Sequence, residues 1–339
     1  METIFDTGIT LIFWLQSLGN SLIIVMKGFT FLGNEQFYLL IFPALYWCID
    51  STLGLRTGII LMISGIVNTY FKWAFHLPRP FWYSPDVSAH AVETGFGVPS
   101  GHSQNAVVVW GLIAASLRKR WAWIVAIFLI FFIGLSRMVL GMHFYIDVLA
   151  GWLLGAIILW LFLRFETPVS EWFKQKPVLM QLGFLLAISI AVILFAQLIL
   201  VLAGDWEIPA VWIENAIHAN PEAIPDPFSM SGIISNAAII FGLIGGAVVM
   251  KSRGDFEVKA PMTKLVARYV IGLLGVLVIW GGLDMIFPDG HDFVAYAFRY
   301  LRYGLAGFWM SLGAPWVFIR FKLAEPAQKL NTIQADAAP

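Results

Sequence analysis

Long apolar stretches alternate with short polar segments along most of this chain. Because a helix needs about 20 mostly apolar residues to cross a bilayer, the pattern predicts membrane-spanning helices. We expect nine spans, at Phe37–Ile49, Gly54–Phe75, Gln104–Leu117, Trp121–Leu135, Val148–Leu163, Val178–Leu202, Ile233–Met250, Leu265–Ile286 and Tyr303–Ile319. Ile9–Met26 is also apolar, but it contains Gln16 and Asn20 and precedes Lys27. We expect an amphipathic interfacial helix there, with a tenth span as the alternative.

Basic residues between the predicted spans alternate from one side of the membrane to the other. Lys and Arg are concentrated in the segments 118–120, 164–176 and 251–264 and in the tail after residue 319, whereas Gly204–Ser231 and Asp284–Ala297 contain neither. Cytoplasmic loops carry the excess of Lys and Arg, so the first group is predicted to be cytoplasmic and the second to face outward.

Composition supports an all-α polytopic membrane protein whose main partner is the lipid bilayer. Charged residues make up 12% of the chain, against about 25% in soluble domains, and the mean hydropathy is +0.80. The formal net charge is zero, which gives no basic signature for nucleic acid. The single cysteine, Cys48, excludes an intrachain disulfide and a cysteine zinc cluster. The sequence indicates no particular oligomeric state.

The segments fall into four expected parts. Residues 1–33 form the N-terminal interfacial segment, and residues 34–166 form a helical-bundle core that holds three polar motifs. Residues 167–325 add four transmembrane helices, and residues 326–339 form a cytoplasmic tail that we expect to be disordered.

Three polar stretches interrupt the apolar core. They read KWAFHLPRP (Lys72–Pro80), GVPSGHSQNAV (Gly97–Val107) and SRMVLGMHFYID (Ser136–Asp147). The first two surround the loop after the second span and the third surrounds the loop after the fourth, so all three lie on the non-cytoplasmic side. Charged residues placed there oppose the topological preference, and such residues usually serve a function.

The cations in these stretches predict an anion site. An arginine presents a fork of donors that matches phosphate oxygens, and a lysine presents a point charge. The Ser-Gly turn leads into a helix near Ser103, whose N-terminus offers free N–H groups to an anion, and the glycine lets the backbone approach closely. We therefore expect a phosphate to be bound by Lys72, Arg79, Ser100, Gly101 and Arg137.

The histidines supply candidate covalent chemistry. His143 and Asp147 are four residues apart, so on a helix they share a face, and the carboxylate can fix the tautomer of the imidazole. On this hypothesis His143 attacks phosphorus to form a phosphohistidine, while His102 protonates the leaving oxygen and then activates water. The cations stabilise the developing charge, so we expect no metal and no other cofactor.

Each polar residue also has a structural interpretation. A single histidine in a membrane loop is more often structural than catalytic, Lys72 alone could snorkel to the interface, and Arg137 alone could be an anchor. We expect no direct chemistry from His76, His90, Glu93 and Thr94, although the last two could order the loop. We expect Arg299 and Arg302 to be interface anchors near the outer end of the last span, with contact to an anionic substrate as the alternative.

The three stretches read as K-x6-RP, PSGH and SR-x5-H-x3-D. This series resembles the tripartite signature of the type-2 phosphatidic acid phosphatase superfamily, which is shared with vanadium-dependent haloperoxidases. The resemblance implies a helical-bundle phosphatase core over Phe37–Phe165, with the residue roles given above. The stretches YFKWAF, RPFW and ETGFGVPSGH, the nine-span layout and the acidic, Trp-containing segment Asp205–Pro227 are similar to the glucose-6-phosphatase branch.

The resemblance favours a metal-independent phosphatase for phosphate monoesters. The first hypothesis is a lipid phosphate substrate such as phosphatidic acid, phosphatidylglycerophosphate or a polyprenyl (di)phosphate, and the second is a soluble sugar phosphate. A vanadate haloperoxidase, a transporter and a degenerate scaffold are less favoured. The tail QADAAP has no dilysine retrieval signal and the chain has no N-x-S/T sequon. Both features suit a bacterial inner membrane, with the active site on the periplasmic side.

Overall fold

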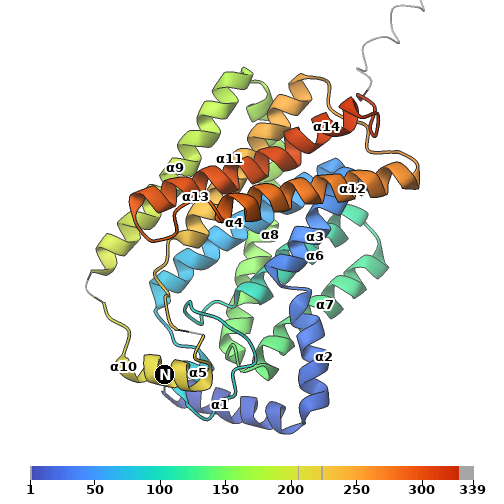
Figure 1. Ribbon diagram of the computed structural model, residues 1–339. Coiled ribbons are helices and arrows are strands. Elements are labelled where there is room, and N and C mark those ends of the chain that lie inside the picture. Colours follow the sequence, from blue (N-terminus) through green and yellow to red (C-terminus); the bar gives the residue numbers. More distant parts are fainter. Residues whose placement is uncertain (1, 205, 223, 328–339) are drawn as a thin grey trace, which may run out of the picture. The chain divides into compact units, whose positions relative to one another are not determined.

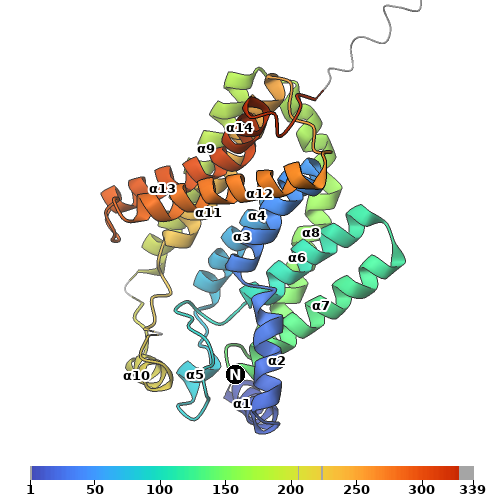
Figure 2. The same ribbon diagram turned by 45° about the vertical axis from the view of Figure 1, so that its right-hand side comes forward.

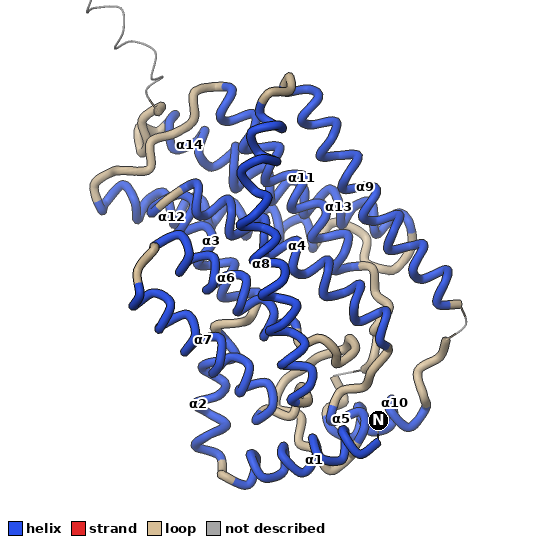
Figure 3. The backbone as a smooth tube through the Cα atoms, turned by 180° about the vertical axis from the view of Figure 1, so that it is seen from behind, coloured by secondary structure: helices blue, strands red, loops and turns tan. Residues whose placement is uncertain are grey.

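The computed structural model describes residues 2–204, 206–222 and 224–327, and its regular elements there are helices (Figure 3). Apart from them, a single bridge pairs Phe256 with Pro326. Most of the predicted tail, residues 328–339, lies outside the described residues. An all-α fold is therefore confirmed for the part of the chain that is described.

The chain divides into two compact units. The motif unit comprises Met1–Leu39, Ile60–Val169 and Ala191–Asn236, and the second unit comprises Leu40–Ile59, Ser170–Ile190 and Ala237–Pro339. All three polar stretches belong to the motif unit.

Two helices open the motif unit where the sequence pattern predicts one. Helices α1 (Glu2–Ser17) and α2 (Asn20–Phe31) are bent by 109° at a break that contains Gly19, whose φ is +97°. Gln16, which interrupts the apolar pattern, donates from its amide to the carbonyls of Ser88 (2.9 Å) and Val139 (3.2 Å). This polar residue therefore ties α1 to the motif loops.

The motif-bearing helices follow. These are α4 (Ser51–Phe75), the short α5 (Pro80–Tyr83), α6 (Gly101–Leu117), α7 (Arg120–Val139) and α8 (Tyr145–Lys174). Helices α6 and α7 lie side by side, joined by a tight turn in which Arg118 has a positive φ (Figure 2). The core between α4, α6 and α8 is apolar and consists of Tyr38, Ile60, Leu61, Val108, Val109, Leu112, Ile158 and Leu159.

Close helix packing sets the position of the start of α6. A Cβ on Gly151 of α8 would lie 2.6 Å from the carbonyl oxygen of Ser100, and one on Gly155 would lie 2.8 Å from that of Gln104. Small residues let two helix backbones approach in this way. The glycines of α8 therefore place the second polar stretch directly on the helix that carries Asp147.

A later segment of the motif unit packs against α5 and the first polar stretch. Helix α9 (Val178–Ala203) leads to α10 (Ala210–Ala219), which contacts α5. Asn215 donates from its amide to the carbonyl of Trp82 (3.0 Å), and the Trp73 indole donates to the carbonyl of Pro227 (2.6 Å). The segment after α9 is therefore fixed both to the first polar stretch and to α5.

The second unit is also helical. It draws on α3 (Glu35–Ala44), α11 (Ser231–Ser252), α12 (Met262–Leu277), α13 (Phe293–Phe308) and α14 (Ala314–Arg320), and π-helical turns extend three of these, at Leu45–Ile49, Val278–Gly282 and Trp309–Gly313. Figure 1 shows α13 and α14 as one continuous rod. The buried Arg268 donates to the carbonyls of Trp47, Val258 and Leu323, so it crosslinks three segments of this unit.

The number of spans differs from the expectation. Six helices of the described chain are long and apolar enough to cross a membrane, or seven if the bent α1–α2 pair is one span, so the expected nine are not confirmed. Two predicted spans fall on short helices, because α6 has 17 residues and the helical segment Glu35–Ile49 includes a π-helical end.

Candidate active site

Arg79 organises the first polar stretch. It precedes α5 and is fully buried. Its Nε donates to the carbonyl of Gly95 (2.6 Å), and its Nη1 donates to the carbonyl of Met142 (3.1 Å) and lies 3.2 Å from His143 Nε2. Its Nη2 contacts Glu93 Oε2 at 3.2 Å. This one guanidinium therefore joins the loop before α6 to the turn after α7.

The second polar stretch forms the N-terminus of α6. Ser100 caps this helix through its hydroxyl, which accepts from the N–H of Ser103, and its own N–H donates to the carbonyl of Asp147 (2.9 Å). The N–H of Ser100 and the acceptor side of its hydroxyl are therefore engaged with protein. The first-turn N–H groups of Gly101 and His102 have no intrahelical partner and are the donors suited to an anion.

The third polar stretch makes a tight turn between α7 and α8. Gly141 has a φ of +72°, a conformation that favours glycine. The N–H groups of Met142 and His143 both donate to the carbonyl of Arg137, at 2.9 and 3.2 Å. The turn thus holds Arg137 and His143 next to each other.

The pair His143–Asp147 is buried and oriented. His143 lies just before α8 rather than on it, and its Nδ1 is 3.1 Å from Asp147 Oδ2, which also accepts from the N–H of Phe144 (2.9 Å). A carboxylate at Nδ1 assigns the proton to that nitrogen. The lone pair is then on Nε2, the atom that faces Arg79.

His102 is held by a residue outside the three motifs. Its Nε2 lies 2.7 Å from Asn34 Oδ1, so the amide oxygen assigns the proton to Nε2 and leaves Nδ1 to accept or donate at the site. Nδ1 lies 3.8 Å from Glu93 Oε1. Nothing in the sequence spacing indicates Asn34, because it precedes His102 by 68 residues.

Glu93 lies at the centre of the site, although nothing in the sequence predicts direct chemistry for it. Arg137 Nη2 contacts Glu93 Oε1 at 2.7 Å, opposite the contact with Arg79, while Arg137 Nη1 donates to Thr30 Oγ1 on α2 at 2.6 Å. Arg137 is almost fully buried, and its Nε has no hydrogen-bond partner in the described structure. Two buried arginines therefore share one carboxylate.

Lys72, the third predicted cation, belongs to the same cluster. It lies in the last turn of α4 and is partly buried. A Cβ built on Gly95 would lie 3.8 Å from its Nζ. Lys72 therefore lies beside Gly95, whose carbonyl accepts a hydrogen bond from Arg79.

The charges of the site act on one another. Burial raises the pKa of Glu93, but Arg79 and Arg137 outweigh it and hold this pKa well below its usual range. Burial and the charge of Arg137 lower the pKa of His102 to about 3. Burial, followed by the charges of Arg79 and Arg137, places the pKa of His143 well below its usual value. Both histidines are therefore neutral near pH 7 while no anion is bound.

The other singled-out residues lie apart from this cluster. His90 is held through its backbone N–H, which donates to Leu140, and His76 packs its ring against Phe96, Trp206 and Phe228. Thr94 accepts at its carbonyl from the N–H of Asp226.

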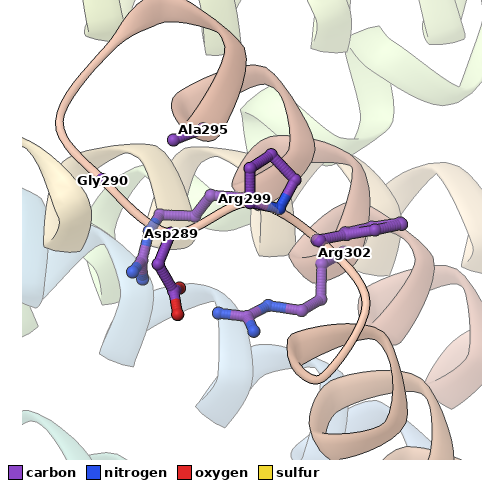
Figure 4. A pocket seen from close by; sticks show the side chains of 7 residues that line it. Asp289, Gly290, Ala295, Arg299 and Arg302 are labelled. Atoms are coloured by element: carbon purple, nitrogen blue, oxygen red, sulfur yellow. The ribbon is translucent and has the colours of Figure 1, made fainter.

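Two arginines expected to be anchors line a separate pocket in the second unit. Arg299 and Arg302 surround it together with Asp289 and the loop before α13 (Figure 4). Arg302 is paired with Asp284.

Among the described residues, no group of three or more His, Cys, Asp or Glu side chains is placed to hold a metal ion.

Two buried arginines around the carboxylate of Glu93, next to a histidine–aspartate pair, form a site of a kind suited to phosphate. The sequence matches the PAP2 superfamily over residues 53–170 and the transmembrane extension of PAP2 superfamily phosphatases over residues 234–326. The chain belongs to the PAP2 superfamily, which confirms the resemblance seen in its motifs. It is an integral membrane protein and a phosphoric monoester hydrolase.

Individual relatives cover the chain to different extents. Glucose-6-phosphatase 3 from Bos taurus is 28% identical over 96% of this chain and 98% of its own length. Phosphatidylglycerophosphatase B from Bacillus subtilis is 30% identical over 45% of this chain and 78% of its own length. Among solved structures, a transmembrane PAP2-type phosphatidylglycerolphosphate phosphatase from Bacillus subtilis matches with 26% identity and a TM-score of 0.43, over 50% of this chain and 89% of that one.

Proposed function

We propose that the protein hydrolyses phosphate monoesters through a phosphohistidine on Nε2 of His143. The observation that carries this proposal is the orientation of the imidazole. Its Nδ1 is held by Asp147 at 3.1 Å, and its Nε2 is directed toward the arginine cluster. A nucleophile held in one tautomer next to anion-binding groups is suited to attack a bound phosphoryl group.

In the first step, the Nε2 lone pair attacks phosphorus while the bond from phosphorus to the ester oxygen breaks. His102, protonated at Nδ1 in the complex, gives its proton to the leaving oxygen. Arg79 and Arg137 stabilise the charge that builds on the phosphoryl oxygens. In the second step, His102 takes a proton from water, the water oxygen attacks phosphorus, and the electron pair of the P–N bond returns to His143.

The intermediate itself provides the test. Mixing the purified protein with a 32P-labelled monoester and quenching with alkali should trap label on protein, because phosphohistidine survives alkali and is lost in acid. Peptide mapping should place the label on His143. Label that survives an acid quench, as phosphoserine does, or no labelled protein during active turnover, would contradict the mechanism.

Two substrate classes remain as proposals, each supported by one observation. The near full-length likeness to glucose-6-phosphatase 3 supports a soluble sugar phosphate. The likeness of part of the chain to phosphatidylglycerophosphatase B supports a lipid phosphate.

Parallel assays in detergent with EDTA would separate the substrate classes. We expect phosphate release without a divalent metal from glucose 6-phosphate, phosphatidic acid or polyprenyl diphosphate, offered at equal concentration. A preference of at least about tenfold in kcat/KM, equal to about 1.4 kcal/mol, would assign the class. Release that requires added Mg²⁺ or Zn²⁺ would contradict the metal-independent mechanism.

The two histidines should give a bell-shaped pH dependence. Because the pKa of His143 lies well below its usual value, activity should fall only far on the acidic side, where His143 is protonated. The pKa of His102 is about 3 in the empty site, and a phosphate bound beside it should raise that pKa. Activity then falls as the pH rises through the raised pKa, so the basic limb of kcat should lie at higher pH than that of kcat/KM. Coincident limbs, or a flat profile, would contradict the scheme.

We also propose that the site faces the periplasm of a bacterial inner membrane. The alternation of basic segments supports this orientation. In a Cys48→Ala background, Asp86→Cys, in the exposed part of the loop before α6, should react with an impermeant maleimide in intact cells. Lys119→Cys, between α6 and α7, should react only after permeabilisation. The reverse pattern would place the site in the cytoplasm.

A further inference from the structure

The carboxylate of Glu93 lies where the two active-site arginines point. Its Oε2 is 3.2 Å from Arg79 Nη2 and its Oε1 is 2.7 Å from Arg137 Nη2, with His102 Nδ1 at 3.8 Å from Oε1. An acidic side chain of the protein therefore makes contacts of the kind that phosphate oxygens make with an arginine pair.

We propose that Glu93 is an internal anion that holds the phosphate position in the empty site, and that a substrate phosphate must displace it. The inference rests on the proposed function in one respect, namely that the substrate phosphate binds between Arg79 and Arg137. Its consequence is selectivity for dianionic phosphate monoesters over monoanionic phosphodiesters.

The hydrogen bonds of the arginines show where a phosphate would compete with Glu93. The Nε and Nη1 of Arg79 are directed to the carbonyls of Gly95 and Met142, and Nη1 of Arg137 is directed to Thr30. The Nη2 atoms of both arginines are directed to Glu93. A phosphate that binds both arginines through these atoms competes with the carboxylate for the same N–H groups.

Burial indicates which partner moves. Arg79 and Arg137 have side chains that are 0% and 1% exposed, whereas the side chain of Glu93 is 24% exposed. The arginines are fixed by protein oxygens deep in the site. Glu93 is on its open side, so the carboxylate can turn toward solvent while the cradle keeps its shape.

The charge of a ligand then determines how well it competes with Glu93 for the two arginines. Displacing Glu93 removes one negative charge from two buried guanidinium groups. A monoester dianion brings two negative charges to the same place, whereas a phosphodiester brings one and gains nothing over the resident carboxylate. Interactions between charges are stronger in a buried site than in water, so this difference of one charge favours the monoester.

Direct binding measurements test the proposal without turnover. Inorganic phosphate and dimethyl phosphate would be titrated into the detergent-solubilised protein at pH 8 by calorimetry. Glu93→Gln keeps the size of the side chain and removes the competing charge. We expect it to bind phosphate at least about tenfold more tightly than the wild type and to bind dimethyl phosphate measurably, so that the preference for the dianion shrinks.

A matched control separates local competition from a general change in charge. Asp86→Asn removes a carboxylate from the exposed part of the loop before α6, within the same unit. It should change phosphate affinity less than about twofold, because exposed charges are screened by water and salt. An equal gain in both variants would contradict displacement at the arginines.

Other results of the phosphate titrations would contradict the proposal. Weaker or unchanged phosphate binding by Glu93→Gln would mean that the carboxylate holds the arginines in place. If that variant does not fold, Glu93→Asp keeps the charge but retracts it by one methylene, and it too should bind phosphate more tightly. Phosphate binding without hydrolysis of any monoester would refute the proposed reaction and leave this inference intact. A wild type and variant that both fail to bind phosphate would contradict the inference.

Discussion

Replacing His143 with alanine is expected to abolish phosphate release, with a fall in kcat of about 10⁵-fold or more, because the covalent step loses its nucleophile. His143 is the residue whose Nε2 faces the arginines while its Nδ1 is held by Asp147. Water in the space left by the imidazole would be neither oriented nor activated in the same way. The measurement is phosphate release by the purified variant at saturating substrate, with enzyme concentration raised to reveal the residual rate.

His90→Ala is the matched control for this variant. His90 lies in the loop before α6, and the structure fixes it through its backbone N–H, which alanine retains. Its activity should remain within about twofold of the wild type, as is usual for substitutions that leave the site contacts intact. Substantial release by His143→Ala, with no change in substrate preference, would show that the nucleophile is another group.

Replacing Arg79 with lysine is expected to lower kcat/KM about 10³-fold, although the positive charge is kept. The guanidinium reaches two carbonyls, Glu93 and His143 at once, and a lysine ammonium cannot reproduce that planar fork. The carbonyls of Gly95 and Met142 would then lose this donor in a buried place and Glu93 would keep only Arg137, so the free energy of unfolding should fall by about 3 kcal/mol. Steady-state kinetics and denaturation in detergent would measure the two effects separately.

Arg320→Lys provides the comparison for Arg79→Lys. Arg320 is exposed at the end of α14, so the same chemical change there should leave both activity and stability nearly unchanged. If Arg79→Lys kept kcat/KM within tenfold of the wild type, a point charge would suffice and the fork geometry would have no catalytic value.

Local spacing explains why the sequence predicts part of this site. His143 and Asp147 are close along the chain, and the PSGH stretch lies directly before an apolar run, so short-range geometry alone suggests both features. Arg79 and Arg137 are recognisable as cations placed against the preferred membrane topology. Such arguments need no knowledge of how distant segments pack.

The remaining contacts depend on long-range packing, which spacing does not encode. Asn34 reaches His102, and Thr30 reaches Arg137, only because the chain before α4 folds back onto α7. Glu93 belongs to a loop without regular structure, so no periodicity marks its orientation. The nine expected spans are not confirmed, because two of the predicted apolar runs fall on helices that are shorter than 18 residues.

The two glycines of α8 that approach α6 also limit how this sequence can vary. Methyl groups at Gly151 and Gly155 would meet the backbone of α6 at 2.6 and 2.8 Å, closer than packed atoms approach. Residues on the outward side of α8, such as Leu153, can be exchanged among apolar types at little cost. For anyone redesigning this enzyme, the pair Gly-x3-Gly is therefore a part of the scaffold to keep, although neither glycine takes part in the reaction.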